Sequence, residues 1–284
     1  MLRYSFWLTL LLSAVTAFPQ TKPAAQKTKP FVLGVIDEVQ SDVLGEKRLL
    51  NIYLPEGYND DTKATFPVTY LLDGSADEDF IHVVGLFQFN SFSWINRVPP
   101  SIVVGIATVD RRRDFTFPTT IASDKTKYPT TGRSDKFIAF IKDELQPYIE
   151  KNYRTNGSKT LIGQSLGGLL AAQILIEKPS FFNKYIIVSP SIWWDNGSLL
   201  ERNFTQIQRI SQPTDIYIAV GKEGLTPTEP PRVMEVDANV LADQIRALKN
   251  PAVHVYFDYL PDEDHATIMH RAVSNGLHAL YPKQ

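Results

Sequence analysis

The residues best placed for chemistry lie in the segment 163–168, GQSLGG, which has the pattern G-x-S-x-G. A short apolar run at 160–162 precedes this segment, and an apolar helical pattern follows it from Leu169. A serine on such a sharp strand-to-helix turn is presented to substrate, and the flanking glycines avoid clashes with neighbouring backbone. We therefore predict that Ser165 is a nucleophile. The alternative is a plain glycine-rich turn; a phosphate-binding loop is disfavoured because no lysine follows the glycines.

A serine nucleophile needs a base, because its hydroxyl is a weak nucleophile at neutral pH. When the serine lies on a strand-to-helix elbow, the histidine comes last in chain order, after the final strand. Of five histidines, His265 lies in the loop that follows the last apolar run, 253–257. We predict that His265 is the base, with His270 as the substitute and a solvated loop histidine as the nonfunctional alternative.

The third member of such a site is a carboxylate that orients the imidazole and stabilises its positive form. In this arrangement it usually follows the penultimate strand, here the apolar run 216–220, which leads into Gly221-Lys222-Glu223-Gly224. We predict that Glu223 is the acid. Other carboxylates remain open as alternatives, namely Asp195, Glu229, Glu235 and Asp237.

The negative charge that develops on a carbonyl oxygen during attack requires backbone N–H donors. One should be the N–H of Leu166, directly after the nucleophile, and the other should come from the loop after the run 68–72, at Gly74 or Ser75. A simple turn is the alternative for this loop.

Three side chains are candidates for substrate binding because they follow predicted strands, where ligands bind in sheets of this kind. Arg112 follows the run 102–106 and could meet an anionic or catecholic acyl group, although a surface arginine paired with the neighbouring aspartates is equally consistent. Trp193 and Trp194 follow the run 185–189 and could stack on a flat ring, but we expect at least one of them to pack in the core. The segment 115–133 is either a rim over the pocket or a surface connection.

The elements that must position these residues alternate along the chain. Runs that are apolar on both faces predict buried parallel strands, and amphipathic patterns between them predict helices. Ahead of them, alternating runs at 32–39 and 48–53 flank a turn at Gly45 and predict an antiparallel hairpin. The predicted fold is an α/β domain with a mostly parallel central sheet, an N-terminal antiparallel hairpin and helices on both faces.

Composition narrows the possible functions. The 284 residues are 43% hydrophobic and 21% charged, with a formal net charge of -2. A net charge this close to zero gives the protein no overall positive electrostatic potential that would attract nucleic acid or an anionic membrane. The absence of cysteine excludes disulfides, thiolate metal sites and a cysteine nucleophile. Nothing in the sequence indicates the oligomeric state.

The N-terminal residues have the features of an export signal. Arg3 supplies positive charge, residues 6–15 are apolar, and Val15-Thr16-Ala17 fits a small-residue cleavage site. We predict a signal peptide at 1–17, a flexible leader at 18–30 and a single domain at 31–284, hence a secreted or periplasmic protein without stable membrane insertion after cleavage. An uncleaved N-terminal membrane anchor is the alternative.

Taken together, these motifs resemble the esterase family of α/β hydrolases that includes esterase D, feruloyl esterase and enterochelin esterase-like enzymes. The resemblance extends over nearly all of the chain after Phe31 and is carried by NIYLPEGY at 51–58, YLLDG at 70–74, RRDFT at 112–116, GQSLGG at 163–168, SPSIWW at 189–194 and DH at 264–265. Within that family the chain most resembles the periplasmic siderophore-esterase-like branch. The resemblance implies the α/β-hydrolase fold, and in that branch the acid follows the penultimate strand, as Glu223 does.

The sequence therefore predicts a serine carboxylesterase that forms an acyl-enzyme on Ser165, needs no metal ion or organic cofactor, and acts on a small-molecule or glycan ester, including siderophore and carbohydrate esters. Two alternatives stay open. An acyltransferase would use the same residues but pass the acyl group to an alcohol, and a noncatalytic ligand-binding protein could share the fold.

Overall fold

A computed structural model describes residues 29–226 and 228–283. The chain divides into two units, 1–33 and 34–284, and the fold described below is that of the second unit. The predicted signal peptide and most of the predicted leader lie outside the described residues. Within the described residues, no helix has both the length and the apolar character required to cross a bilayer.

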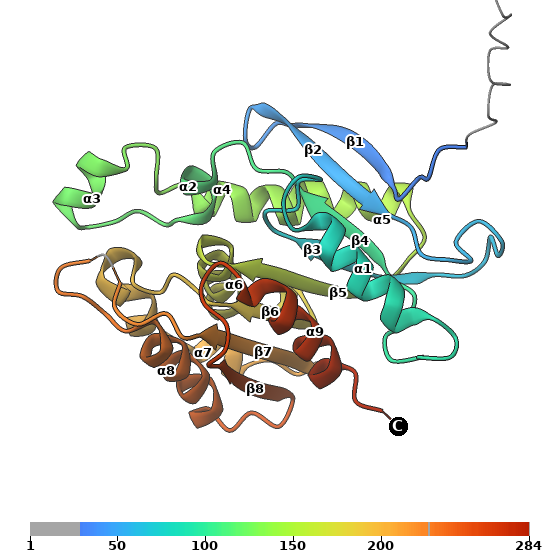
Figure 1. Ribbon diagram of the computed structural model, residues 1–284. Coiled ribbons are helices and arrows are strands. Elements are labelled where there is room, and N and C mark those ends of the chain that lie inside the picture. The colour runs from blue at the N-terminus through green and yellow to red at the C-terminus, as the bar shows by residue number, and fades with distance from the viewer. Residues whose placement is uncertain (1–28, 227, 284) are drawn as a thin grey trace, which may run out of the picture. The chain divides into compact units, whose positions relative to one another are not determined.

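The core of the second unit is one sheet of eight strands in the order β1-β2-β4-β3-β5-β6-β7-β8 (Figure 1). Strands β1 and β2 form the predicted antiparallel hairpin, β2 also pairs antiparallel with β4, and every later pairing is parallel. The predicted mostly parallel sheet with an N-terminal hairpin is confirmed. The strands are β1 (Val35–Ser41), β2 (Glu46–Tyr53), β3 (Phe66–Leu71), β4 (Ile102–Ile106), β5 (Thr155–Gln164), β6 (Lys184–Val188), β7 (Thr214–Gly221) and β8 (Val253–Leu260).

Helices connect the strands and cover both faces of the sheet. The α-helices are α1 (Phe80–Ser91), α2 (Arg111–Phe115), α3 (Ala122–Lys127), α4 (Ser134–Ala139), α5 (Gln146–Asn152), α6 (Leu166–Glu177), α7 (Thr205–Gln208), α8 (Met234–Ala247) and α9 (Ile268–Leu280). A π-helical segment η1 (Phe140–Leu145) joins α4 to α5, and two 3₁₀ segments, η2 (Pro179–Phe181) and η3 (Trp194–Glu201), follow α6 and β6.

The alternation of side chains along each strand divides the core into two layers. On one face, Leu161, Ile187 and Ile218 pack with the apolar sides of α5, α6 and α8. On the other face, Ile186 and Tyr217 lie against Gly276 of α9, beside which α1 packs (Figure 1). Central strands such as β3 and β4 are buried on both faces, as predicted from their continuous apolar runs.

The last strand differs from the prediction. Its apolar run, 253–257, was expected to be buried on both faces, but β8 is the edge of the sheet and its residues alternate between exposed and partly buried positions. Successive side chains of a strand point to opposite faces of the sheet, and here Val253, Val255 and Phe257 pack against the core from one face, whereas His254 and Tyr256 are exposed on the other.

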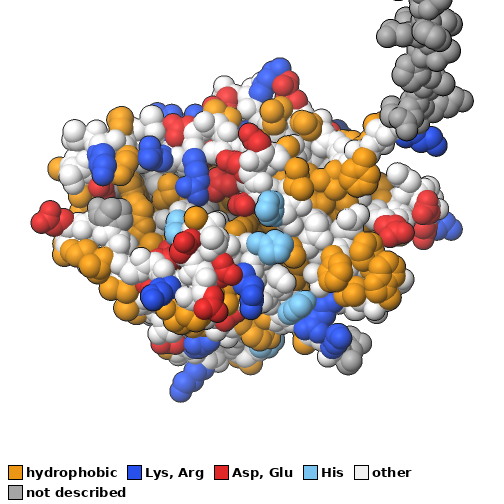
Figure 2. Space-filling view, viewed as in Figure 1, with side chains coloured by type: hydrophobic (Ala, Val, Ile, Leu, Met, Phe, Trp, Pro, Cys, Tyr) orange, Lys and Arg blue, Asp and Glu red, His pale blue; other side chains and the backbone are white. Residues whose placement is uncertain are grey.

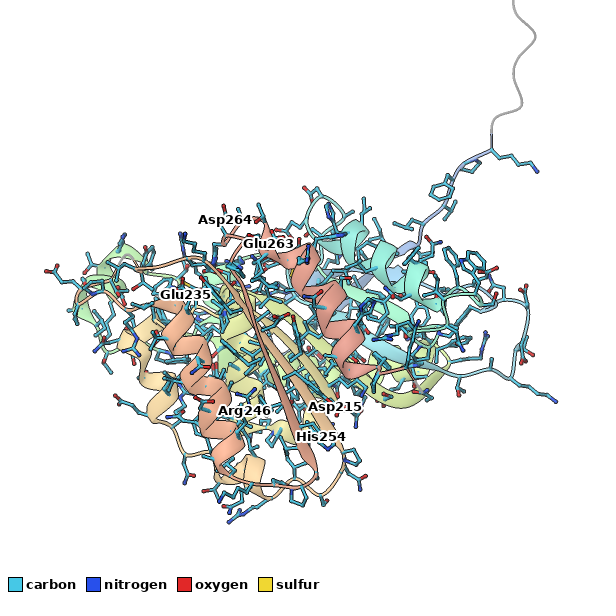
Figure 3. All side chains as sticks on the ribbon, turned by 60° about the horizontal axis from the view of Figure 1, so that its bottom comes forward. Asp215, Glu235, Arg246, His254, Glu263 and Asp264 are labelled. Atoms are coloured by element: carbon cyan, nitrogen blue, oxygen red, sulfur yellow. The ribbon has the colours of Figure 1, made fainter. Side chains whose placement is uncertain are left out.

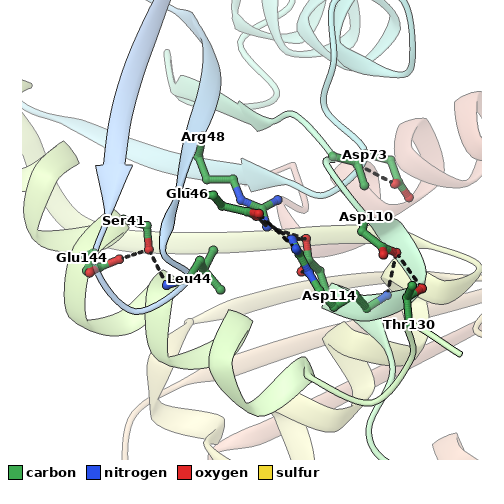
Figure 4. Close-up of polar contacts among 11 residues, drawn as sticks. Ser41, Leu44, Glu46, Arg48, Asp73, Asp110, Asp114, Thr130 and Glu144 are labelled. Carbon is green, nitrogen blue, oxygen red and sulfur yellow. Dashed lines mark hydrogen bonds and ion pairs between the residues drawn. The ribbon is translucent and has the colours of Figure 1, made fainter.

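A buried charge network ties the N-terminal hairpin to α2 (Figure 4). The side chain of Arg48, on β2, is fully buried, and its Nη2 lies 2.6 Å from Asp114 Oδ2 and 2.5 Å from Glu46 Oε1. Arg113 pairs with the same two acids. A buried charge is tolerated only when it is paired, so this network fixes α2 relative to the sheet.

Asp114→Asn should lower the free energy of unfolding by about 3 kcal/mol, because it weakens the pairing of a fully buried arginine. Urea denaturation monitored by circular dichroism measures the change. As a control, Glu38→Gln breaks an exposed pair with Lys47 and should change stability by less than about 0.5 kcal/mol. Equal effects of the two substitutions would contradict the assignment.

Candidate active site

Ser165 lies on the sharp turn between β5 and α6, as the sequence predicted. Its φ of 58° and ψ of -119° are strained for a residue with a side chain. Two flanking glycines make the turn possible: a Cβ on Gly163 would lie 2.4 Å from the carbonyl oxygen of Gly167, and a Cβ on Gly168 would lie 2.8 Å from that of Val188. The N–H of Ser165 donates to the Val188 carbonyl, and the Ser165 carbonyl accepts from Ser191 N–H, so the turn is held from both sides.

The structure brings the three principal predicted residues together. His265 Nε2 lies 2.9 Å from Ser165 Oγ, and His265 Nδ1 lies 2.6 Å from Glu223 Oε2. The three residues follow β5, β7 and β8, whose carboxyl ends meet at one edge because these strands are parallel. A continuous line of hydrogen bonds therefore runs from the serine hydroxyl to a carboxylate.

The carboxylate of Glu223 is held in its ionised form. Its side chain is only 4% exposed, and its Oε1 accepts from the hydroxyl of Ser189. Burial raises the pKa of Glu223, but the hydrogen bonds from His265 and Ser189 outweigh burial, so the pKa lies below its ordinary value. A negative charge therefore faces the imidazole at neutral pH.

Backbone contacts join the loop of Glu223 to the loop of His265. The N–H of Lys222 donates to the Glu263 carbonyl over 2.7 Å, and a Cβ on Gly221 would lie 2.6 Å from the same carbonyl oxygen. Glu263 and Asp264 are labelled beyond the end of β8 in Figure 3.

Gln164 Nε2 donates to the His265 carbonyl over 2.5 Å, which ties the histidine loop to the serine turn. Sequence reasoning missed this role of Gln164, although the residue lies inside the G-x-S-x-G motif.

Glu235, one of the alternative acids, instead supports the turn that carries Glu223. Its carboxylate accepts from the N–H of Glu223 over 2.9 Å and from the N–H of Gly224 over 3.0 Å. Gly224 has a φ of +72°, which turns both N–H groups toward the start of α8, where Glu235 lies. The structure therefore gives Glu235 a positioning role and places it away from the imidazole nitrogens.

The remaining alternative acids make other contacts. Asp195 accepts from Thr119, Thr120 and Ser198, and these hydrogen bonds account for its buried carboxylate. Asp237 pairs with Arg232. Glu229 is exposed.

The other histidines lie outside the hydrogen-bond line. His270, the substitute base, is exposed on α9, with its ring 6.0 Å from that of His82. His254 pairs with Asp215, and Figure 3 shows both at the opposite end of the strands from Glu263 and Asp264. His254 lies at the amino end of β8, whereas Ser165 follows the carboxyl end of β5, so the two residues are at opposite ends of the parallel strands.

One of the predicted oxyanion donors is already occupied. The N–H of Gly74 donates to the Ile106 carbonyl over 3.1 Å, because this residue continues the pairing of β3 with β4. Gly74 therefore does not offer a free donor, which corrects that part of the prediction. Leu166 begins α6, where the first N–H groups have no partner within the helix. The N–H of Ser75 makes only a long contact, 3.4 Å, with Glu78.

A further contact that the sequence did not indicate joins this turn to the serine. Arg111 Nε lies 2.9 Å from Asp73 Oδ1, and its Nη2 donates to the Gln164 carbonyl over 3.2 Å. Asp73 has a φ of 52° and is also bound by Thr108. Arg111 thus connects the turn after β3 to the residue before Ser165, which fixes the distance between the two regions.

All three candidate substrate residues reach the wall of a cavity beside Ser165, but they differ in how much of each side chain is accessible. Arg112 is exposed at the wall of a cavity of about 580 Å³, with its guanidinium 4.7 Å from the ring of Tyr128. Trp193 is half-buried and lines the same cavity. Trp194 also reaches the cavity wall, but it is only 2% exposed and its indole N–H donates to the Phe117 carbonyl. Trp194 is therefore a core residue, and it does not present a free face for stacking.

The segment 115–133 contributes to the rim of this cavity. Tyr128, Thr130 and Thr131 line it, and α3 lies within the same segment. Of the two possibilities left by the sequence, the structure favours a rim over a simple surface connection. Among residues 29–226 and 228–283, no cluster of three histidine or acidic side chains is arranged to hold a metal ion.

One face of the described surface is mixed in charge. Lys, Arg, Asp and Glu side chains are interspersed on the face shown in Figure 2. This distribution agrees with the small formal net charge of the chain, -2.

Comparisons with known proteins identify the family. The family model described as Putative esterase matches residues 41–262. Ferri-bacillibactin esterase BesA of Bacillus subtilis (strain 168) is 30% identical over 253 residues, which are 84% of this chain and 86% of BesA. The crystal structure of BES protein from Bacillus cereus is similar with a TM-score of 0.78 and 28% identity, covering 92% of this chain and 100% of that one.

The crystal structure of an IroE-like serine hydrolase from Shewanella oneidensis is similar with a TM-score of 0.76 and 30% identity, covering 87% of this chain and 80% of that one. Of the functions considered from the sequence, ester hydrolysis is the one named by both the family model and BesA. The chain belongs to the Putative esterase family of α/β-hydrolase fold, and it is a carboxylic ester hydrolase of the serine hydrolase type.

Proposed function

We propose that Ser165, His265 and Glu223 are the nucleophile, base and acid of this esterase, and that its substrate is an iron-carrying siderophore ester. The observation that carries the catalytic assignment is the hydrogen-bond line from Ser165 Oγ through His265 to Glu223. The similarity to a ferri-bacillibactin esterase, over 86% of that protein, supports the substrate class.

In the acylation step, Ser165 Oγ forms a bond to the ester carbonyl carbon while its proton passes to His265 Nε2. The resulting imidazolium is stabilised by the Glu223 carboxylate. The bond from the carbonyl carbon to the alcohol oxygen then breaks, and His265 gives the proton to that oxygen. Water attacks the acyl-enzyme, passes a proton to His265 and releases the acid, after which the proton returns to Ser165.

The N–H of Leu166 is the first donor to the oxyanion, because it begins α6 directly after the nucleophile. The second donor comes from the turn after β3, at Ser75 rather than Gly74, whose N–H is bonded to Ile106. Arg111 supports this geometry through Asp73 and the Gln164 carbonyl.

The protein is also proposed to be exported, with residues 1–17 as a signal peptide and residues 31–284 as a single catalytic domain. The support is the order of features in the N-terminal segment, where a positive charge is followed by an apolar stretch and then by a small-residue cleavage site. A ferric siderophore would then meet the enzyme outside the cytoplasm.

Ser165→Ala should reduce kcat for 4-nitrophenyl butyrate at least about 10⁴-fold and abolish labelling by a fluorophosphonate, because the acyl-enzyme can no longer form. Ser158→Ala, outside the site, is the control and should label normally. Substantial turnover or labelling of Ser165→Ala would refute the nucleophile.

The wild-type enzyme should also hydrolyse ferri-bacillibactin, with the addition of one water for each ester bond cleaved, as detected by liquid chromatography and mass spectrometry. Ser165→Ala should leave this compound intact. Hydrolysis of simple esters without hydrolysis of the ferric siderophore would contradict the substrate class while leaving the catalytic assignment in place.

Glu235→Ala should lower kcat about 10-fold to 100-fold with little change in KM, because the N–H groups of Glu223 and Gly224 lose the carboxylate that accepts from them. Glu235→Gln retains one acceptor oxygen and should recover part of the loss. The matched control is Glu229→Ala, which removes an exposed carboxylate from the same connection. If Glu235→Ala lowers the melting temperature but leaves kcat unchanged, the positioning role of Glu235 is contradicted.

The lowered pKa of Glu223 also predicts how stability depends on pH. Because the folded pKa lies below the ordinary 4.5, ionised Glu223 stabilises the fold above that pH, and this stabilisation is lost as pH falls through the folded pKa. Below about pH 4.5 the free energy of unfolding of the wild type should therefore fall more steeply than that of Glu223→Gln. Urea denaturation from pH 3 to pH 6 tests this, and parallel curves would contradict it.

A further inference from the structure

Two adjoining cavities open on Ser165. The first, about 580 Å³, lies beside α2 and the segment 128–131, and the second, about 470 Å³, lies beside the loops that carry Glu223 and His265. Ser165 and Trp193 are the residues that line both. Trp193 therefore lies at the boundary between them. Each cavity is of a size that accommodates a bulky organic group, so the site can hold an ester with large substituents on both sides.

The positions of the reacting groups distinguish the two cavities. His265 lines the second cavity only, and it must pass its proton to the departing alcohol oxygen. Leu166, the proposed first donor to the oxyanion, lines the first cavity only. With the alcohol oxygen on the His265 side, the acyl substituent of the tetrahedral carbon extends toward the first cavity.

The charges of the two cavities also differ. In the first cavity, Arg111 is paired with Asp73, and Asp110 accepts from the Arg113 N–H. Among the described residues, Arg112 has no carboxylate within ion-pair distance, and its guanidinium lies over Tyr128. Arg112 is thus a cation with an aromatic partner at the wall of this cavity, available to a ligand.

The second cavity is lined mainly by uncharged side chains beyond the catalytic residues. Leu225, Thr226, Met234 and Ala266 form its wall. The charged side chains of Lys222 and Asp264 are exposed and of opposite sign. This cavity therefore fits an alcohol without net charge.

We propose that the cavity beside Arg112 binds the acyl half of the ester, that the cavity beside His265 binds the alcohol half, and that Arg112 selects acyl groups bearing negative charge. The assignment rests on the esterase mechanism proposed above and extends it to the orientation of the substrate. It makes Arg112 a determinant of acyl specificity and Trp193 the boundary between the two halves.

The test uses two 4-nitrophenyl esters with the same alcohol, namely those of terephthalic acid, with one free carboxylate, and of terephthalamic acid, its neutral isostere. The wild type should prefer the carboxylate ester. Arg112→Gln should lower the ratio of the two kcat/KM values about tenfold, as expected for the loss of one charge-assisted hydrogen bond. Arg209→Gln, an exposed arginine outside both cavities, changes net charge equally and should preserve the ratio.

A second variant tests whether the cavity beside His265 binds the alcohol half of the ester. Leu225 is 69% exposed at the second cavity, so Leu225→Trp adds bulk there without burying it in the core. It should lower the ratio of kcat/KM for 2-naphthyl benzoate over methyl benzoate, and it should leave the rate of benzoyl-enzyme hydrolysis unchanged, because the alcohol has already departed. Arg112→Gln should slow hydrolysis of the acyl-enzyme that bears the carboxylate.

The orientation is overturned if Arg112→Gln leaves the acyl-charge ratio unaltered, or if Leu225→Trp changes benzoyl-enzyme hydrolysis. Failure of the esterase assignment has a different signature: no ester of the set is cleaved by the wild type, or Ser165→Ala cleaves them. The two failures are therefore distinguishable in the same set of assays.

Discussion

Ser165 holds a backbone conformation, φ 58° and ψ -119°, that a residue with a side chain adopts only when its surroundings enforce it. Here the enforcement comes from β6, whose Val188 carbonyl accepts from the Ser165 N–H, and from the glycines on either side. The strain places Oγ above the carboxyl edge of the sheet. Every other feature of the site has to be arranged around that fixed position.

The parallel sheet meets this requirement because successive strands end at the same edge. Serine, acid and histidine are far apart in sequence, yet they follow β5, β7 and β8 and so arrive on one side of the sheet. The loops are then joined to one another through Lys222, Glu263 and Gln164. Loop-to-loop hydrogen bonds supply the final alignment, which strand geometry alone would leave too loose for proton transfer.

The sequence predicted the parts of the fold that depend on local pattern. Continuous apolar runs identified the central strands, and the glycine-flanked serine identified the elbow, because both are properties of neighbouring residues. It could not show that the Gly74 N–H is taken by Ile106, since β3 and β4 are separated by α1 in the chain. Nor could it show that Trp194 turns inward to Phe117, or that Glu235 serves the acid turn, because each depends on contacts between distant segments.

The same contrast between local pattern and long-range contact applies to the site. The proposed catalytic residues are positioned by the strands that they follow, whereas the proposed selectivity residue is positioned by a contact with a distant segment. The proposed catalytic residues lie at strand ends, whereas Arg112 lies on the short helix α2, whose place is fixed by the pairing of Asp114 with Arg48 of the hairpin. A five-residue helix has too few internal hydrogen bonds to be stable alone, so its orientation depends on this buried pair. The N-terminal hairpin, remote from the serine in sequence, thereby sets where the cation of the cavity lies. If Arg112 selects the acyl group as proposed, changes in the hairpin should alter which acyl groups are accepted before they alter the positions of Ser165, His265 and Glu223.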